Sequence, residues 1–268
     1  MKKLLSILEI EMKRPTNYGW FHLMFVFLVI LVTVFLCFKF KNISDKGFRR
    51  IVLFSWITMV ILEGYKQFVF SYSLENSIIE WEYQWYAFPY QFCSTPLYVL
   101  PFIVFLKEGS IRDSFILYIS TFSLFGGLAV FLYPNDVFID TIGVNIQTMV
   151  HHGLQIILGI YFIVYARKKF NLKNFLGSTI VFMVLGLIAI LLNCFAYTRI
   201  EEEFNMFFIS PYYNCTLPIL SQIYPKVSYS AFVFIYVFGF AMIALLIYAI
   251  GRGSLKITSL RERRNAKI

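Results

Sequence analysis

Charged residues are scarce in this 268-residue chain: they make up 15% of it, whereas 59% of the residues are hydrophobic and 20% are aromatic. Soluble domains usually carry about 25% charged residues and about 45–50% apolar ones. The shortage of charge therefore excludes a soluble globular enzyme, a disordered chain and a disulfide-stapled mini-protein. It indicates a polytopic membrane protein.

Cysteine and histidine are also few, with four and three residues respectively. No two cysteines form a CxxC pair, which disfavours a zinc site or a thioredoxin-like dithiol. His151 and His152 are adjacent, whereas a pair of helical metal ligands needs a spacing of three or four residues. We therefore expect no metal and no other cofactor.

The charges that are present give a net charge of +9, from 24 Lys and Arg against 15 Asp and Glu. An excess of this size can indicate nucleic-acid binding. A chain this apolar has little water-facing surface for such a footprint, so the excess is better explained by orientation in a membrane. We therefore expect membrane lipids, and no nucleic acid, as binding partners.

Long apolar runs dominate the sequence. A helix needs about 20 mostly apolar residues to cross the hydrocarbon core, which is roughly 30 Å thick. Barrel strands would alternate apolar and polar residues, and these runs do not, so we predict an all-α bundle of seven transmembrane helices. The seven runs are Trp20–Phe38, Ile51–Phe70, Tyr90–Leu106, Ser114–Tyr133, Thr148–Ala166, Phe175–Ala196 and Ser230–Ile250.

We expect a single transmembrane domain over residues 20–250, because no repeat or linker divides it. Residues 251–268 form a basic tail. Residues 1–19 precede the bundle, and their apolar side chains can share one face of a helix, which predicts an amphipathic segment lying at the membrane interface. These side chains are Leu4, Leu5, Leu8 and Met12.

The basic residues collect at one end of the predicted bundle. They lie in the loops at 39–50, 107–112 and 167–173 and in the tail, whereas the other loops carry mostly acidic residues. Because Lys and Arg accumulate on the cytoplasmic side, we place the C-terminus in the cytoplasm and the N-terminus outside, in the cell membrane. The basic residues that oppose this orientation are fewer: Lys2, Lys3, Lys13 and Arg14.

Two ionisable residues lie inside the second run. An ionisable side chain at the membrane midplane costs about 2.5–3.5 kcal/mol on insertion scales, so each one needs a reason. Glu63 and Lys66 are three residues apart and therefore share a helical face. They can form a neutral pair that holds helices together, or they can belong to a binding site.

The third run begins with the sequence FPYQFCSTP, which contains Cys93 and Pro96. Pro96 and Pro101 supply no amide proton to the carbonyls of Phe92 and Leu97. A carbonyl freed in this way at membrane depth must be buried in protein or face a wet cavity. A single membrane cysteine such as Cys93 is usually a small packing residue, and only its neighbours can make it a nucleophile.

The fifth run begins with His151 and His152, whose side chains point about 100° apart on a helix. Either ring can hydrogen-bond lipid headgroups or act as a base. Asn205, in the last outer loop, adds an uncharged polar group. The predicted topology places Glu63, Lys66, Cys93 and both histidines in the outer half of the bundle, as expected for one polar cavity open to the outer leaflet.

These residues resemble a known family, the YwaF-like bacterial integral membrane proteins. Phe88–Ser94 resembles the LPLHLC segment of that family, His152-Gly153 resembles the HG pair that opens a later helix, and Glu63 matches an acidic residue of its second helix. Similar short stretches occur at Tyr133–Asp136, Asn205–Phe207 and Tyr224–Lys226. The family is distantly similar to the eukaryotic transmembrane protein 164 family, which is associated with acyl transfer to lysophospholipids through a cysteine.

The resemblance implies that Cys93 is a nucleophile and that His152 is its base. The chain departs from the family at one position, because the histidine two residues before the cysteine is Gln91 here. His151 is a candidate replacement for that histidine. Gln91 and Asn205 then join Glu63 and Lys66 as candidate substrate-binding residues.

Three functions fit these features. The first is a cysteine-dependent phospholipid acyltransferase or transacylase, in which Cys93 carries the acyl chain as a thioester. The second is a non-enzymatic transporter or binding component for a small solute or a lipid, which also needs an outer cavity and a charged pair. The third is a structural membrane protein whose polar groups only hold its helices together.

Overall fold

The computed structural model describes residues 6–75, 78–134, 137–200 and 202–265. Apart from one short hairpin, its regular elements are helices, and six of them are long and apolar enough to cross a membrane. This confirms the prediction of an all-α membrane protein. The six are Trp20–Lys39 (α2), Asp45–Phe70 (α3), Ser110–Leu132, Ile142–Tyr165 (α7), Leu172–Tyr197 (α8) and Tyr229–Ile257, the last being part of α10.

The third predicted run is different, because only its second half forms a regular helix. A single 3₁₀ turn, Phe92–Ser94 (η2), leads into the short helix Pro96–Phe105 (α4). The apolar helical stretch covers Phe92–Phe105 and is shorter than the roughly 20 residues a crossing needs. The described part of the chain thus has six helices long enough to cross a membrane and one shorter apolar helix of 10–17 residues, and the count of seven spans remains a prediction.

The span Ser110–Leu132 consists of three segments. They are Ser110–Tyr118 (α5), a π-helical turn at Ile119–Ser123 (η3) and Leu124–Leu132 (α6). Every residue of the π turn is buried. Single π turns inside α-helices occur frequently at functional sites, and this one packs against α7 and α10.

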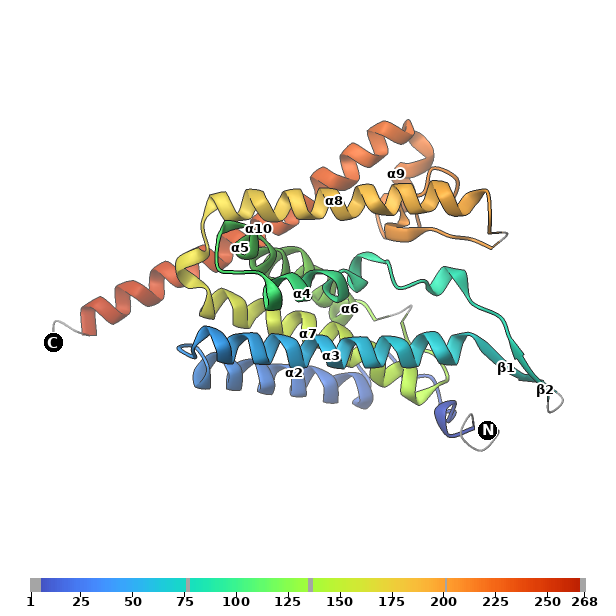
Figure 1. Ribbon diagram of the computed structural model, residues 1–268, viewed down its shortest axis with the longest axis horizontal. Coiled ribbons are helices and arrows are strands. Elements are labelled where there is room, and N and C mark those ends of the chain that lie inside the picture. The colour runs from blue at the N-terminus through green and yellow to red at the C-terminus, as the bar shows by residue number, and fades with distance from the viewer. Residues whose placement is uncertain (1–5, 76–77, 135–136, 201, 266–268) are drawn as a thin grey trace.

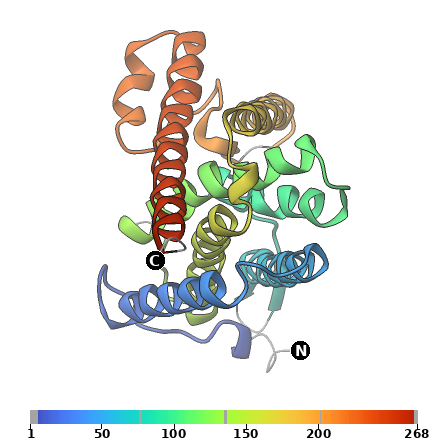
Figure 2. The same cartoon turned by 90° about the vertical axis from the view of Figure 1, so that its left-hand side faces the viewer.

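α7 lies at the centre of the bundle. Two-thirds of its apolar window is buried, as is two-thirds of the window in Ser110–Leu132, compared with 28% for α2 and 11% for α10. α2, α3 and α6 all pack on α7, whereas α8 packs on α5. Figure 2 shows α7 surrounded in this way. The outer helices expose large apolar side chains, as expected of surfaces that face lipid.

Side-chain caps fix where two of the helices begin. The Ser44 hydroxyl accepts a hydrogen bond from the Gly47 amide at the start of α3, at 3.3 Å. The Asn171 side chain accepts one from the Asn174 amide at the start of α8, at 3.0 Å. Such caps satisfy amide groups that have no partner within a helix.

At the opposite end of α3 lies an antiparallel hairpin of Tyr72–Glu75 (β1) and Ile78–Trp81 (β2), in which Tyr72 pairs with Trp81. It projects from the bundle beside the N-terminal segment (Figure 1). A single 3₁₀ turn, Trp85–Ala87 (η1), follows it. The hairpin and this turn carry the chain from α3 back toward Cys93.

The predicted amphipathic N-terminal helix is only partly present. Lys2, Lys3, Leu4 and Leu5 lie outside the described residues, and the helix that contains Ser6–Leu8 ends before Ile10. Glu11 instead forms a β-bridge with Thr141, and the Met12 amide donates to the Asp140 carbonyl at 2.8 Å. The expectation that Leu8 and Met12 share a helical face is wrong, because the backbone of Glu11 and Met12 pairs with Thr141 and Asp140 and is not helical.

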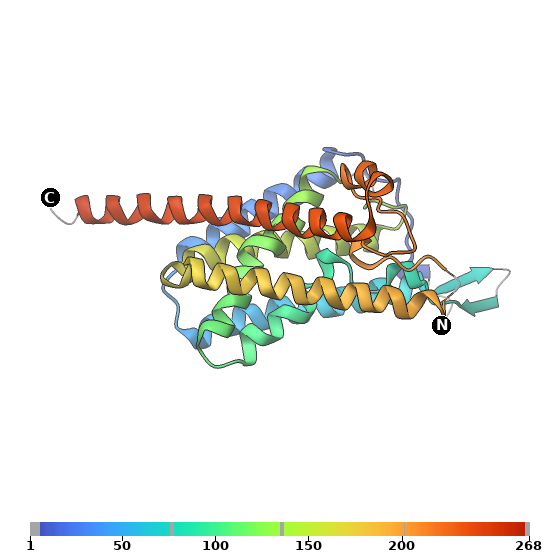
Figure 3. The same ribbon diagram turned by 90° about the horizontal axis from the view of Figure 1, so that it is seen from above.

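The last part of the chain forms one long helix, Tyr229–Asn265 (α10). The region we treated as a separate basic tail from residue 251 continues this helix without a break and projects beyond the bundle (Figures 1 and 3). In the described residues of the connection between α8 and α10, the regular elements are short single turns. They are Met206–Phe208 (η5), Leu220–Ile223 (α9) and Tyr224–Lys226 (η6), and a further turn, Arg167–Lys169 (η4), joins α7 to α8.

Candidate functional site

Cys93 lies where irregular backbone becomes helix, inside the single turn η2 and just before α4. Non-helical backbone at membrane depth is tolerated only where protein or a cavity supplies hydrogen-bond partners. The carbonyl of Phe92, which receives no proton from Pro96, accepts a hydrogen bond from the Thr95 hydroxyl at 2.7 Å. The carbonyl of Leu97, opposite Pro101, accepts one from the Trp56 indole at 2.9 Å. Both proline-freed carbonyls are thus satisfied within the protein.

The carbonyl of Cys93 itself is held by α7. It lies 3.0 Å from Nε2 of His151 and accepts a hydrogen bond from Nε2 of Gln155 at 2.9 Å. His151 and Gln155 are four residues apart and share a helical face. The nucleophile candidate is therefore fixed to the central helix of the bundle by its own backbone.

These contacts also define which ring nitrogens of the histidines carry protons. A carbonyl only accepts hydrogen bonds, so His151 donates from Nε2 to Cys93, and His152 donates from Nδ1 to the Thr148 carbonyl at 2.8 Å. In the neutral rings this leaves a lone pair on His151 Nδ1 and on His152 Nε2. Both atoms are buried and have no hydrogen-bond partner among the residues that the structure describes, and neither does Oε1 of Gln155.

The charged pair of α3 forms as predicted, with 2.7 Å between Lys66 Nζ and Glu63 Oε1. Glu63 is 5% exposed. Its carboxylate also accepts from the amides of Gln67, at 2.8 Å, and Gln147, at 3.5 Å. Gln67 in turn accepts a hydrogen bond from the Tyr83 hydroxyl, at 2.7 Å. A buried carboxylate satisfied from α3 and α7 links the two helices at this depth.

The pair, the cysteine and the histidines form one cluster. Lys66 and Glu63 are close enough for their charges to act on the Cys93 thiol and on His152, and the rings of His151 and His152 are 5.4 Å apart between centroids. The predicted convergence of these residues from three segments is thus present. Sγ of Cys93 lies beside the Ser94 hydroxyl, and in the described residues no hydrogen bond joins it to either imidazole.

Two adjacent glycines let α6 approach this cluster closely. A Cβ atom at Gly127 would lie 2.7 Å from the carbonyl oxygen of His152, and one at Gly126 would lie 3.2 Å from Oε1 of Gln155. Real Cβ atoms are essentially never found closer than 3.0 Å to such a neighbour. Only glycine at position 127 therefore allows the present spacing between α6 and α7.

Gln91 and Asn205 contact each other, but among the described residues no hydrogen bond joins either of them to His151 or His152. The Gln91 amide donates to the Asn205 carbonyl at 3.0 Å and accepts from the Phe207 amide at 2.8 Å. Asn193 binds the neighbouring Met206 through both its carbonyl and its amide. The side chains of Gln91 and Asn193 thus hold the loop 205–208, in which Phe207 has φ 58° and Phe208 has φ 56°. Such values are uncommon for bulky residues and need this support.

Sequence reasoning missed Gln155, Gln147 and Gln67 as members of the site. A usable signal existed for two of them, because Gln147, His151 and Gln155 recur every fourth residue and so form one polar stripe on an otherwise apolar helix. Gln67 extends the face of Glu63 by the same spacing. Uncharged amides in spanning helices commonly serve as hydrogen-bonding groups between helices, so the sequence alone does not mark these glutamines as members of a site.

The remaining cysteines lie in other surroundings. Cys215 is buried in the connection before α10, and burial raises the pKa of its thiol. Cys37 and Cys194 are half-buried in α2 and α8. Within the described ranges, no three His, Cys, Asp or Glu side chains are grouped as metal ligands.

The fold defines a polytopic all-α membrane protein in which a polar cluster that contains Cys93 lies between α3, η2 and α7. The sequence model of the TMEM164 family matches residues 17–252, and the chain belongs to this family. Comparison with curated proteins and with solved structures gives no match. The match spans every helix that contributes to the cluster.

Proposed function

We propose that this protein transfers acyl chains between lipids through a thioester on Cys93. The observation that carries the proposal is the contact between α7 and Cys93. His151 and Gln155 bind the Cys93 carbonyl, and on the same helix two buried imidazole lone pairs have no partner in the described part of the chain. Buried polar atoms without partners are rare and call for an explanation. A proton acceptor beside a thiol is one such explanation.

The reaction has two steps. The Cys93 sulfur attacks the ester carbonyl carbon of a phospholipid, and Nε2 of His152 takes the thiol proton. The tetrahedral intermediate collapses, the lysophospholipid oxygen leaves, and His152 returns the proton to it. In the second step the hydroxyl of an acceptor attacks the thioester, gives its proton to His152, and releases the acylated product and the thiol.

The other polar groups have distinct roles in this proposal. The Lys66 ammonium favours the thiolate, since it acts on the thiol electrostatically, and Glu63 holds Lys66 in place. His151 and Gln155 position the nucleophile. Gln91 and Asn205 contribute to substrate binding, and the two hydrogen bonds of Gln91 to the Asn205 carbonyl and the Phe207 amide fix the position of the loop at 205–208.

The finer assignments are also part of the proposal. The short motifs at Phe88–Ser94 and His152-Gly153 support a place within the YwaF-like group of the family. The basic loops support a cytoplasmic C-terminus and an outer-leaflet-facing site in the cell membrane. Membrane lipids are then both donor and acceptor.

The test is to incubate purified protein with a phospholipid that carries a labelled acyl chain. We expect a labelled Cys93 peptide whose label is released by hydroxylamine, and no label in Cys93→Ala. Cys194→Ala is the matched control, because Cys194 is another half-buried thiol in a spanning helix, and it should label as the wild type does. Labelling that survives Cys93→Ala would overturn the proposal.

The same preparation distinguishes the competing functions. His152→Ala should lose the adduct while the protein still unfolds cooperatively. Solute uptake into liposomes that depends on Glu63 but not on Cys93 would support a transporter instead. Variants at Cys93, His152 and Glu63 that lower thermal stability and change neither activity would support a purely structural role.

A further inference from the structure

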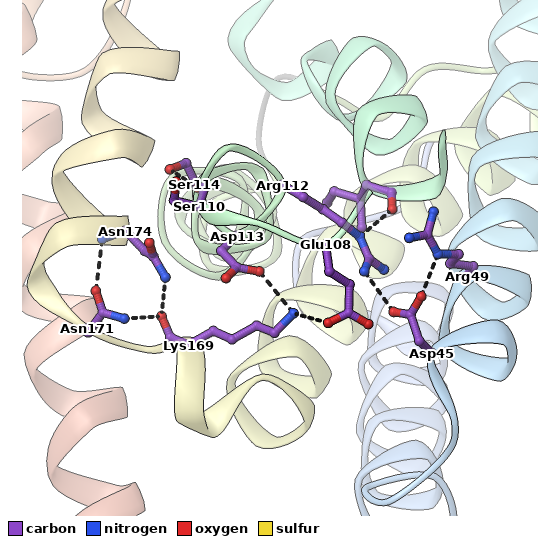
Figure 4. A network of polar contacts seen from close by, with 11 residues as sticks. Asp45, Arg49, Glu108, Ser110, Arg112, Asp113, Ser114, Lys169, Asn171 and Asn174 are labelled. Atoms are coloured by element: carbon purple, nitrogen blue, oxygen red, sulfur yellow. Dashed lines mark hydrogen bonds and ion pairs between the residues drawn. The ribbon is translucent and has the colours of Figure 1, made fainter. Parts of the chain in front are cut away.

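A second polar region lies at the other end of α3, about 27 Å from Glu63 along the helix axis. Its centre is Arg112, whose side chain is fully buried. Arg112 donates to Oδ1 of Asp45 at 2.7 Å and to the Ile103 carbonyl at 2.8 Å, and its guanidinium lies 5.6 Å from the centroid of the Phe48 ring. Figure 4 shows this network joining α3 to α5.

Asp45 is shared between two cations. Besides Arg112, it accepts a hydrogen bond from Nε of Arg49 at 2.6 Å. Each oxygen of the Asp45 carboxylate therefore already binds a guanidinium group. In the part of the chain that the structure describes, Lys46 and Arg50, in the same first turns of α3, have no acidic partner.

These basic residues surround a pocket. The pocket lies between α3 and the end of α4, has a volume of about 340 Å³, and is lined by Asp45, Lys46, Arg49, Arg50, Leu53 and Val104. Three of its six lining residues are cations and one is an anion. Because Arg112 also binds Asp45, the one negative charge of the lining is compensated, and the pocket has an excess of positive charge.

An apolar strip begins where the pocket ends. Arg50, Phe54, Ile57 and Ile61 follow one another at spacings of three or four residues and so lie along one face of α3. Phe54 is 74% exposed, Ile57 44% and Ile61 65%. In a spanning helix, such a face contacts lipid chains.

We propose that this pocket binds the phosphate group of an anionic membrane lipid. Lys46 and Arg50 donate charge-assisted hydrogen bonds to the phosphate oxygens, and the acyl chains run along Leu53 and the exposed strip of α3. Basic pockets at helix ends on the cytoplasmic side are suited to anionic headgroups. A soluble phosphate compound would gain the same polar contacts and none of the apolar ones, so the strip selects the lipid.

The experiment measures lipid bound to the purified full-length protein in detergent by native mass spectrometry. The probes are phosphatidylglycerol, the zwitterionic phosphatidylcholine, and soluble glycerol phosphate. We expect wild-type protein to retain phosphatidylglycerol, and Lys46→Gln/Arg50→Gln to bind it roughly tenfold less well or weaker still. The matched control is Lys107→Gln/Lys173→Gln, which removes the same charge from exposed positions at the same end, outside the pocket lining.

The outcomes separate the explanations. An equal loss in both double variants would show that general positive charge, and not the pocket, binds the lipid, and would overturn the proposal. Phosphatidylcholine bound as well as phosphatidylglycerol would do the same. Glycerol phosphate that displaces the lipid at equal concentration would assign the pocket to a soluble phosphate and overturn the lipid assignment. Because the assay does not involve Cys93, its result is independent of acyl transfer.

Discussion

Nε2 of His151 lies 3.0 Å from the carbonyl oxygen of Cys93, so a histidine of the central helix binds the backbone of the cysteine and not its sulfur. The contact fixes the ring with Nε2 as the donor and leaves Nδ1 as a lone pair. It also gives a hydrogen-bond partner to a carbonyl that lies just before α4, a helix that begins with Pro96. One residue pair thus links the break in the third run to the site on α7.

Gln155 also binds the Cys93 carbonyl, and its removal should slow acylation without unfolding the protein. Gln155→Leu leaves the Cys93 carbonyl to His151 alone. We expect a loss of ~1 kcal/mol in the free energy of unfolding and a several-fold slower formation of the acyl adduct, measured with labelled phospholipid. Gln222→Leu, at an exposed position of α9, should change neither. Wild-type labelling by Gln155→Leu would remove Gln155 from the site.

The Glu63–Lys66 pair should act mainly through charge compensation. Glu63→Gln leaves the Lys66 ammonium, which is 18% exposed, without its counter-charge. We expect a loss of ~2 kcal/mol in unfolding free energy, measured by denaturant or thermal unfolding in detergent. The double variant Glu63→Gln/Lys66→Met should recover part of that loss.

The exposed Glu82 provides the control for this pair. Glu82→Gln should leave the unfolding free energy within ~0.5 kcal/mol of the wild type. If the double variant is as unstable as Glu63→Gln alone, the loss comes from the hydrogen bonds of Glu63 to Gln67 and Gln147, and not from Lys66.

The orientation in the membrane can be tested with introduced cysteines. In a background without the four native cysteines, Asp140→Cys and Lys168→Cys place a thiol at opposite ends of α7, both at exposed positions. Positive charge in the loops predicts that a membrane-impermeant maleimide labels position 140 in intact cells and position 168 only after permeabilisation. The reverse pattern would invert the topology and place the Cys93 site toward the cytoplasm.

The spans were predictable because each long apolar run has one stable state in lipid, a helix. The run Trp20–Phe38 became Trp20–Lys39, and Phe175–Ala196 became Leu172–Tyr197. The third run was not predictable in this way. Hydropathy records how apolar a segment is and not where its backbone hydrogen bonds go. The Phe92 carbonyl has a local partner in the Thr95 hydroxyl, but the partner of the Leu97 carbonyl is the Trp56 indole on α3, which only folding brings near.

The site was predictable to the extent that it rests on local spacing. Glu63 and Lys66 pair because three residues separate them on a helix. The bond from Gln91 to the loop at Asn205 spans 114 positions in sequence, and no local pattern encodes it. Charged residues in a spanning run call for a functional explanation because they are costly there, whereas a glutamine such as Gln155 is readily explained as a hydrogen bond between helices, although it binds Cys93.

The buried guanidinium at the opposite end should depend strongly on its carboxylate. Asp45→Asn leaves Arg112, whose side chain is fully buried, with no counter-charge. We expect a loss of ~3 kcal/mol in unfolding free energy, and partial recovery in Asp45→Asn/Arg112→Met. Asp140→Asn, at an exposed acid, should be nearly neutral. Equal stability of Asp45→Asn and the wild type would show that Phe48 and the Ile103 carbonyl suffice for Arg112.

The close approach of α6 to α7 should be intolerant of a single methyl group. Gly127→Ala places a Cβ 2.7 Å from the His152 carbonyl oxygen, which is backbone and cannot turn aside. Overpacking of this kind costs ~1–3 kcal/mol, and the shift of α7 should also slow acylation, because α7 holds Cys93. Gly186→Ala, on α8 with nothing within 4 Å, is the control and should be neutral or slightly stabilising, since alanine favours helix. If Gly127→Ala matches that control in both unfolding and labelling, the distance between α6 and α7 does not set the geometry of the site.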